Sequence, residues 1–344
     1  MKPSRLPRMS RRSSRPMNAI DCMSQPYKEQ TTMYLVCGEA LFDFFSEDDA
    51  GGQASKVNFK AIAGGSPFNV AVGLRRLGVD SALFGGLSTD YLGRRLQQVL
   101  QDEGVHPDYL VDFAAPTTLA MVAVGANGSP HYSFRGEGCA DRQLSLAHLP
   151  ALGPEVRGLH FGSFSLVVQP IADTLLALVQ RESGKRLISL DPNVRLNPEP
   201  NIDLWRERIA TLVPLADLIK VSDEDLSLLY PEQDPARVIE GWLQHRCQVV
   251  FLTRGGEGAT VFSRVHGSWS VPASSVKIAD TVGAGDTFQA ALITWLTEHE
   301  LDSVEGVQHL SREQIDGMLR FAVQAAALTC SKTGPDLPYR HQLT

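Results

Sequence analysis

The run Asp280-Thr281-Val282-Gly283-Ala284-Gly285-Asp286 places two glycines and a carboxylate directly before an apolar stretch with helical spacing. Glycine adopts backbone angles that other residues avoid, so the amides of Gly283, Ala284 and Gly285 can turn inward together and form a pocket for an anion. The unpaired N–H groups and the positive dipole end of the following helix favour a phosphate in such a pocket. The run therefore predicts an anion site at a helix start.

Asp286 is the residue of this run that needs a separate explanation. A carboxylate repels a bound phosphate, unless its task is to accept the proton of a hydroxyl that attacks that phosphate. A single Asp at a helix start is most often an N-cap. Capping requires neither Gly283 nor Gly285, so the whole run favours catalysis. We interpret it as the site of a phosphotransferase that acts on an alcohol, with Asp286 as the base.

The composition indicates a globular protein of ordinary type. The chain has 344 residues, of which 43% are apolar and 7% aromatic, enough to bury a large α/β core. Its formal net charge is −7, and beyond residues 1–32 it carries 25 basic against 37 acidic residues. Such an acidic body argues against nucleic acid as a partner.

The cysteines and the apolar runs indicate the compartment. Five cysteines are scattered without a C-x-x-C pair, which suits a reducing compartment and provides neither disulfides nor a zinc site. No stretch approaches the ~18 uninterrupted apolar residues of a membrane helix, and the N-terminal segment lacks the apolar centre of a secretory signal. We therefore expect a cytoplasmic protein with no membrane contact, in which residues 1–32 form a disordered extension.

Short apolar runs alternate with helical patterns from Tyr34 onward. This alternation is typical of an α/β fold, a doubly wound, mostly parallel sheet with helices on both faces, and here it predicts one domain over 33–344. Strands are expected at 34–38, 81–85, 157–161, 187–191, 216–220 and 248–253. Helices are expected at 67–77, 91–103, 170–182, 203–212, 234–245, 285–298 and 312–329.

Two segments, 41–62 and 112–135, interrupt the alternation. They contain strand patterns of period two, Thr118 to Val124 and His131 to Arg135, with turn residues between them and no room for crossover helices. We predict that they form a small β-sheet lid. Shielding the acceptor hydroxyl from water gives such a lid a chemical purpose, because open water would hydrolyse the nucleotide.

Four polar motifs follow predicted strands directly. Ligands of open α/β sheets bind beyond the carboxyl ends of the strands, so these motifs should line one crevice. They are Gly38-Glu39, Asp191-Pro192-Asn193-Val194-Arg195, Lys220-Val221-Ser222-Asp223-Glu224-Asp225 and Thr253-Arg254-Gly255-Gly256.

Two other classes of protein fit the motifs less well. A dinucleotide oxidoreductase should carry G-x-G-x-x-G directly after its first strand, where this chain has Cys37-Gly38-Glu39-Ala40-Leu41, and the P-loop spacing is also absent. A sugar-responsive binding protein without catalysis should lack Asp286 or its glycines, and all are present.

Two motifs resemble the signatures of the ribokinase-like (pfkB) carbohydrate kinases. They are Gly64-Gly65-Ser66-Pro67-Phe68-Asn69-Val70-Ala71 and the run from Asp280 to Phe288. The resemblance extends from about Met33 to the C-terminus. The segments Gly38 to Asp43, Tyr132 to Asp141 and Asp191 to Arg195 look most like those of bacterial fructokinases.

The resemblance implies a role for each matched position. It makes Asp286 the base and the Gly283, Ala284 and Gly285 amides the anion hole. For the sugar it implies Asp43, Gly64, Gly65 and Asn69, with Arg135 and Arg195 meeting either the sugar or the phosphate. For ATP it implies Ser222, Gly283 and Gly285, and Thr253, Gly255 and Gly258 resemble a T-x-G-x-x-G nucleotide loop.

The resemblance also implies cations. The family's N-x-x-E motif is here Ser222-Asp223-Glu224-Asp225, so the shorter Asp225 is expected to act on Mg²⁺ through water, with a helix-start acid as the alternative. Asp280 and Thr281 resemble a monovalent-cation loop, for which K⁺ is the candidate ion.

The expected reaction is transfer of the γ-phosphate of ATP to D-fructose, giving fructose 6-phosphate. Kinases for 2-keto-3-deoxygluconate or 5-dehydro-2-deoxygluconate share much of the pattern and remain alternatives, since Arg135 suits a keto acid. A homodimer that covers the outer face of the lid is also expected.

Overall fold

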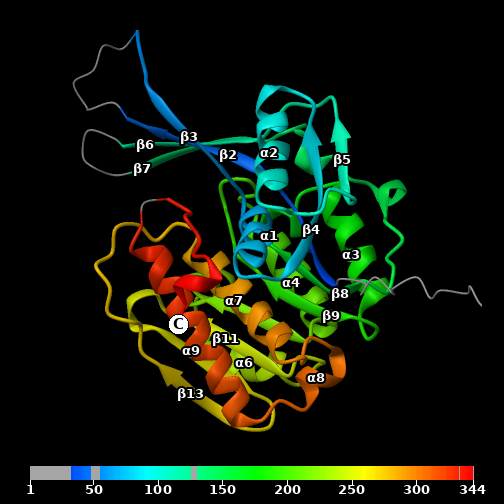
Figure 1. The fold of residues 1–344 in the computed structure, drawn as a ribbon, viewed down its shortest axis with the longest axis vertical. Coiled ribbons are helices and arrows are strands. Elements are labelled where there is room, and N and C mark those ends of the chain that lie inside the picture. The colour runs from blue at the N-terminus through cyan, green and yellow to red at the C-terminus, as the bar shows by residue number, and fades with distance from the viewer. Residues whose placement is uncertain (1–31, 48–54, 125–129, 333, 344) are drawn as a thin grey trace, which may run out of the picture. The chain divides into compact units, whose positions relative to one another are not determined.

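Nine strands form one large sheet in the part of the chain that the computed structural model describes, residues 32–47, 55–124, 130–332 and 334–343 (Figure 1). Their order is β13-β12-β11-β10-β9-β8-β1-β4-β5, with parallel pairing from β5 to β11 and antiparallel pairing of β12 and β13. The strands are β1 Met33–Cys37, β4 Asp80–Ser88, β5 Leu110–Phe113, β8 Val156–Gly162, β9 Leu187–Asp191, β10 Leu218–Ser222, β11 Val249–Thr253, β12 Ala259–Ser263 and β13 Gly267–Val271.

Helices cover both faces of this sheet because its central strands are apolar on both sides. In β1, Tyr34 and Val36 pack into one core with α1, α2, α7, α8 and α9, whereas Leu35 and Cys37 pack into the other with α3, α4, α5 and α6. The helices are α1 Ser66–Arg76, α2 Tyr91–Asp102, α3 Ile171–Glu182, α4 Ile202–Leu212, α5 Asp223–Leu229, α6 Pro235–Trp242, α7 Ala284–Glu298, α8 Val304–Gln308 and α9 Arg312–Cys330.

A second sheet of four strands, in the order β3-β2-β6-β7, extends away from the helices of the large sheet (Figure 1). Two antiparallel hairpins join through parallel pairing of β2 and β6. The strands are β2 Leu41–Ser46, β3 Phe59–Gly64, β6 Leu119–Val124 and β7 Pro130–Arg135. This small sheet contains the strand patterns that the sequence assigned to the lid.

The predicted doubly wound fold is confirmed, with differences at its edges. The antiparallel strands β12 and β13 and the short elements β5, α5 and α8 were not predicted. They have four to seven residues each, too few for a clear hydrophobic period. The second lid segment also starts later than expected, because 110–113 form β5, which pairs with β4 in the large sheet.

Strand β10 begins two residues later than predicted, and its position matters for the site. The prediction was 216–220, but a 3₁₀ turn over Val213–Leu215 is closed by a hydrogen bond from Ala216 N to Val213 O. The Asp217 carboxylate then accepts the amide of Ile188 before the strand starts. Lys220, predicted as the last residue of the strand, therefore lies inside it and is buried.

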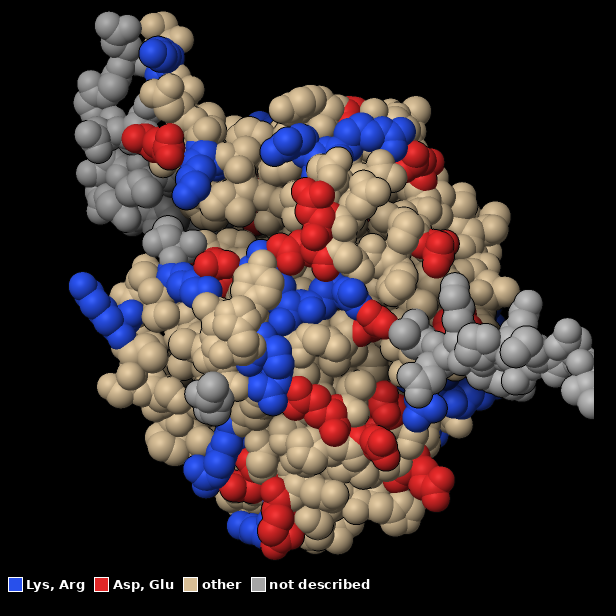
Figure 2. Space-filling model, in the orientation of Figure 1, with Lys and Arg blue, Asp and Glu red and all other residues tan. Residues whose placement is uncertain are grey.

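Several sequence predictions lie outside the described residues: the extension over 1–31 and the lid positions 48–54 and 125–129. Within the described residues, no helix is both long and apolar enough to cross a membrane. On the face seen in Figure 2, Lys and Arg side chains are interspersed with Asp and Glu.

Candidate active site

The carboxyl ends of the parallel strands bring three of the four predicted motifs to one edge of the large sheet. Asp191 is the last residue of β9, Ser222 of β10 and Thr253 of β11, and Ser222 and Thr253 are register partners. The fourth motif, starting at Gly38, follows β1 at the same edge. This is the edge at which open α/β sheets bind ligands.

Asp286 lies in the first turn of α7 and is buried. Two side chains from the start of α1 donate to its carboxylate: Ser66 Oγ to Oδ1 at 2.6 Å, and Asn69 Nδ2 to Oδ2 at 2.8 Å. Each carboxylate oxygen can accept two hydrogen bonds, so each keeps capacity for one more donor. The two contacts therefore fix the carboxylate and leave it able to accept the proton of a substrate hydroxyl.

Ser66 and Asn193 form a relay to Asp286 that the sequence did not reveal. Asn193 Nδ2 donates to Ser66 Oγ at 2.7 Å, so the single Ser66 proton is directed to Asp286. The prediction for Asn69 was a contact with the sugar, whereas its amide nitrogen here contacts Asp286. A sequence signal did exist, because Ser66 and Asn69 are three residues apart and share one helix face.

The predicted anion loop enters α7 through a left-handed residue. Gly283, the N-cap of the helix, has φ 79°, a conformation that residues with a Cβ avoid. The Ala284 amide is not available for an anion, since it donates to Thr281 O at 3.2 Å, which differs from its predicted role. In the described residues no acceptor takes the amides of Gly285 and Asp286, which therefore form the open part of the loop.

Asp43, on β2 of the small sheet, faces the site. Burial and the negative charge of Asp286 together raise the pKa of Asp43 to about 6, while Arg195 acts in the opposite direction. Gly64 lies against the Asp43 carboxylate, and the carbonyl of Gly65 accepts the backbone amide of Asn69 at 2.9 Å. The structure thus brings together Asp43, Gly64, Gly65 and Asn69 near Asp286.

The two predicted arginines are less fixed than the carboxylates. Arg195 is exposed and its Nη1 donates to Val194 O at 2.9 Å, while its charge reaches Asp43. Arg135 is exposed at the end of β7, opposite Leu119 in the register. In the described residues its guanidinium contacts none of the other candidate site residues, so its predicted role stays a prediction.

Ser222 and Asp225 form the N-terminal capping box of α5. The Ser222 hydroxyl accepts the amide of Asp225 at 3.0 Å, and Asp225 Oδ2 accepts the amide of Ser222 at 3.2 Å. Asp225 Oδ1 accepts the amide of Val194 at 2.8 Å, which ties the loop after β9 to α5. Each Asp225 oxygen already accepts one amide and the residue is 3% exposed, an arrangement that suits contact with Mg²⁺ through water.

The predicted nucleotide loop is a tight turn after β11. The Arg254 amide donates to Gly258 O at 2.8 Å and closes it, with Gly255 inside the turn. Thr253 Oγ1 lies 3.5 Å from Val221 O, which connects the ends of β10 and β11. The turn therefore lies at the same sheet edge as Asp286.

The predicted cation loop joins α7 to the segment after α9. Asp280 Oδ1 accepts the amides of Thr281 and Val282 at 2.7 and 3.1 Å, and Oδ2 accepts the amide of Gly334 at 2.9 Å. The amide of Ala279 donates to Cys330 O at 2.8 Å. Asp280 thus anchors the loop that leads to Gly283.

Two further buried side chains, Lys220 and Asp191, form an ion pair at this edge, with Lys220 Nζ 2.9 Å from Asp191 Oδ2. Sequence reasoning quoted both only as parts of motifs. A lysine that continues an apolar strand gives no signal by itself, because the placement of β10 decides whether it is buried.

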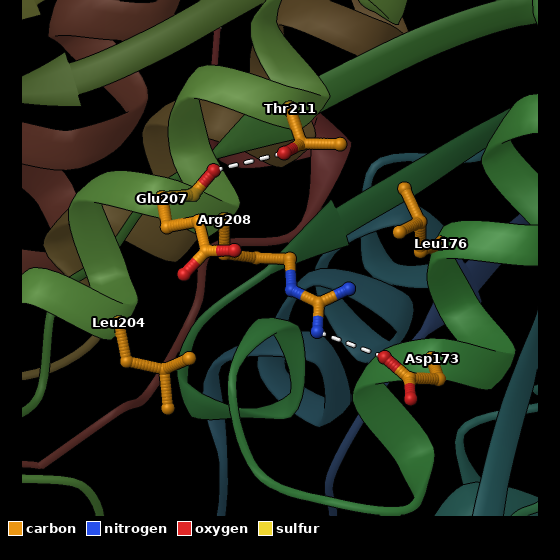
Figure 3. Close-up of a pocket in the computed structure, with 6 residues that line it drawn as sticks. All are labelled: Asp173, Leu176, Leu204, Glu207, Arg208 and Thr211. Atoms are coloured by element: carbon orange, nitrogen blue, oxygen red, sulfur yellow. Dashed lines mark hydrogen bonds and ion pairs between the residues drawn. The ribbon is translucent and has the colours of Figure 1, made fainter.

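A hollow of about 210 Å³ between α3 and α4 lies apart from this site (Figure 3). Asp173 and Arg208 pair across it at 2.9 Å. None of the candidate site residues lines the hollow, so we assign it no part in the chemistry; its lining residues are Asp173, Leu176, Leu204, Glu207, Arg208 and Thr211.

Known proteins of similar sequence and structure point to one family. The model of the pfkB family carbohydrate kinases matches residues 31–342. A fructokinase from Rhizobium leguminosarum bv. trifolii is 36% identical over 82% of this chain and 85% of its own.

Two solved fructokinases have similar folds. That of Xylella fastidiosa with bound ATP gives a TM-score of 0.82 at 27% identity, covering 91% of this chain and 97% of its own. The fructokinase of Vibrio cholerae O395 with fructose, ADP and calcium bound gives a TM-score of 0.76 at 26% identity. The match covers 92% of this chain and 98% of the Vibrio chain. A double mutant of the Vibrio enzyme contains fructose, ADP and potassium.

Proposed function

The chain belongs to the pfkB family of carbohydrate kinases, and from this premise we propose that it transfers the γ-phosphate of ATP to the primary 6-hydroxyl of D-fructose. The observation that carries the proposal is the juxtaposition of a fixed carboxylate, Asp286, with the open amides of the same helix turn. A base and an anion site in one turn suit an alcohol that attacks a phosphate.

In the proposed reaction Asp286 accepts the proton of the sugar hydroxyl as the oxygen attacks the γ-phosphorus. Ser66 and Asn69 hold the carboxylate in place, which keeps its free acceptor positions directed to the hydroxyl. The amides of Gly285 and Asp286 stabilise the negative charge that spreads over the transferring group. ADP leaves, and the product is fructose 6-phosphate.

ATP is proposed to lie along the carboxyl ends of β10 and β11, with the turn at Gly255 and Gly258 beside it and its phosphates reaching Gly283 and Gly285. Mg²⁺, when bound, would neutralise part of the charge of the phosphates, and Asp225 is the residue that would hold it through water. In the described residues no group of three or more His, Cys, Asp or Glu side chains suits a metal. We therefore propose that the phosphates supply most of the Mg²⁺ ligands, with Asp225 acting through water.

A monovalent cation, with K⁺ as the candidate, is proposed for the loop at Asp280 and Thr281. Its support is the anchoring of this loop to the segment after α9, together with the potassium in the related Vibrio enzyme. A bound cation would hold the carbonyls next to Gly283. Replacing K⁺ by Na⁺ or choline in the assay tests this; equal kcat in all three salts would refute it.

Fructose is favoured over 2-keto-3-deoxygluconate and 5-dehydro-2-deoxygluconate for two reasons. The relatives reported above are fructokinases. Asp43, a carboxylate, also lies beside Asp286 and would repel a carboxylated substrate, whereas in the described residues Arg135 contacts no other candidate site residue.

ADP release with a panel of fructose, ribose, the two keto sugars and nucleosides tests the choice of substrate. We expect the largest kcat/KM for fructose. Strong turnover of a keto acid together with none of fructose would overturn the proposal.

Fructose binding is expected to weaken as the pH falls through about 6, because the pKa of Asp43 is raised to about 6 by burial and by Asp286. Above that pH the ionised carboxylate accepts hydrogen bonds from sugar hydroxyls, and below it the neutral group loses part of this capacity. The dissociation constant should then rise by up to about tenfold per pH unit. Calorimetric titration on both sides of pH 6 measures this. Asp43→Asn should bind weakly at every pH, and a flat profile for the unmodified protein would contradict the assignment.

We also propose a homodimer formed through the small sheet. Within the described residues, β3 and β7 are its edge strands, and a sheet edge left open favours pairing with another chain. Sedimentation equilibrium tests this directly, and a monomer at high concentration would contradict it.

A cytoplasmic location is proposed from the cysteines. Cys37, Cys139, Cys247 and Cys330 are free thiols in the described chain, as expected in a reducing compartment. Cell fractionation with an antibody against the protein checks it, and recovery from an oxidising compartment would refute it.

A further inference from the structure

Lys220 is a buried cation inside β10. Its side chain is 4% exposed, and Nζ lies 2.9 Å from Oδ2 of Asp191, whose side chain is 1% exposed. Most lysines keep their ammonium in water, and a lysine is rarely buried unless it is paired. Its position therefore needs a reason beyond the packing of the strand.

The ammonium reaches the first turn of α7 from within the protein. A Cβ added at Gly285 would lie 2.9 Å from Lys220 Nζ. Glycine at this position lets the ammonium approach the helix turn closely, and a Cβ would require it to shift. The cation therefore lies beside Gly285, one of the two residues whose amides are proposed to receive the transferring phosphate.

The groups around Lys220 are mostly acidic. Burial lowers the pKa of Lys220, but the carboxylates of Asp191, Asp225 and Asp286 outweigh burial and raise it. The Lys220 charge also acts on His160, whose pKa is lowered to about 3 by burial and by this charge. Lys220 is thus held as a cation among three carboxylates, one of which is the proposed base.

Without the Lys220 cation, the carboxylates of the site would repel the phosphates of ATP. Asp191, Asp225 and Asp286 are all buried at the edge where the phosphates of ATP must enter. Like charges in a poorly solvated site repel strongly, and charge builds up further as the phosphoryl group moves. A fixed cation beside the anion loop offsets this repulsion.

We propose that Lys220 is an electrostatic positioning residue for phosphoryl transfer, which holds the Gly285 turn and stabilises the negative charge that develops beside it. The proposal rests on the proposed kinase function. The alternative is a purely structural role, in which Lys220 serves only to neutralise Asp191. The two roles differ in what happens when both members of the pair are removed.

The test compares Lys220→Met with the double variant Lys220→Met/Asp191→Asn. The single variant leaves a buried carboxylate without its partner and should lower both Tm and kcat. In the double variant the unpaired charge is gone, so Tm should recover, but kcat should stay roughly 10- to 100-fold below the unmodified enzyme. If kcat recovers together with Tm, Lys220 only neutralises Asp191 and the proposal is wrong.

A second measurement keeps the test decisive if the single variant folds poorly. MgADP with aluminium fluoride and fructose mimics the charged transferring group, and its inhibition constant should rise in the double variant by about the same factor as kcat falls. Affinity for a non-hydrolysable ATP analogue should change by far less. Equal losses of both affinities would refute a role specific to the transferring group.

The matched control is the pair of Arg246 and Asp217, which lies at the opposite end of the strands with Nε 2.6 Å from Oδ1. Arg246→Met/Asp217→Asn should leave kcat unchanged. All rates are compared on whichever sugar the unmodified enzyme phosphorylates. A failure of fructose as substrate is therefore distinguishable from a failure of the Lys220 proposal.

Discussion

Asp286→Asn is expected to lose ~10²–10⁴-fold in kcat while it binds ATP and fructose nearly normally. An amide has the shape of the carboxylate but cannot accept the sugar proton. Ser66 and Asn69 each donate a hydrogen bond to one Asp286 oxygen. In the Asn variant an NH₂ group replaces one of these oxygens and faces a hydrogen-bond donor. Some stability should therefore be lost as well, about 1–3 kcal/mol. Steady-state kinetics and calorimetric titration of both ligands measure the two effects.

The control for this variant is Asp217→Asn. Asp217 is 1% exposed, accepts the amide of Ile188 at 2.9 Å and lies at the opposite end of the strands. It should lose stability without loss of kcat. Near-normal turnover in Asp286→Asn, or an equal loss of kcat in both variants, would contradict the assignment of the base.

Gly283→Ala is expected to lose ~10²–10³-fold in kcat, because the anion loop depends on its left-handed conformation. At φ 79° an added Cβ is strained, and it would also lie 3.0 Å from Cβ of Pro335. Relief of this strain would turn the following amides away from the phosphate. The strain itself should cost about 1–2 kcal/mol of stability.

Gly267→Ala is the control that separates the loss of stability caused by backbone strain from the loss of activity. Gly267 has φ 74° in the hairpin of β12 and β13, with nothing within 4 Å of an added Cβ. Thermal unfolding should show a similar loss of stability in both variants, but only Gly283→Ala should lose activity. A fully active Gly283→Ala would show that the loop does not bind the transferring group.

Features formed by residues that are close together in the sequence were predicted best. Gly283 and Asp286 are three residues apart, so the turn, the helix start and the carboxylate could be read together. The same holds for the period-two strands of the small sheet and for the long helices. Short elements with no clear period, such as α5 with its seven residues, were missed.

What the sequence left hidden are contacts between distant segments. Ser66 and Asp286 are 220 positions apart, and Asn193 and Ser66 are 127 apart, so no local pattern indicates that they touch. Lys220 was hidden for another reason. The predicted strand ended at Lys220, at the sheet edge where a lysine is ordinarily solvated, whereas β10 continues to Ser222 and buries it. Ala284 shows the reverse, since the family resemblance assigned its amide to the anion while the amide donates to Thr281 O here.

The central claim is that this chain moves the γ-phosphate of ATP to the 6-hydroxyl of fructose. Phosphorus and carbon NMR of the product formed from ATP and ¹³C-labelled fructose tests it most directly, because the coupling identifies the carbon that carries the phosphate. The account predicts phosphorus coupled to C6, with Asp286→Asn giving almost no product. Phosphorus on another carbon, or no phosphorylated fructose from the folded protein, would contradict it.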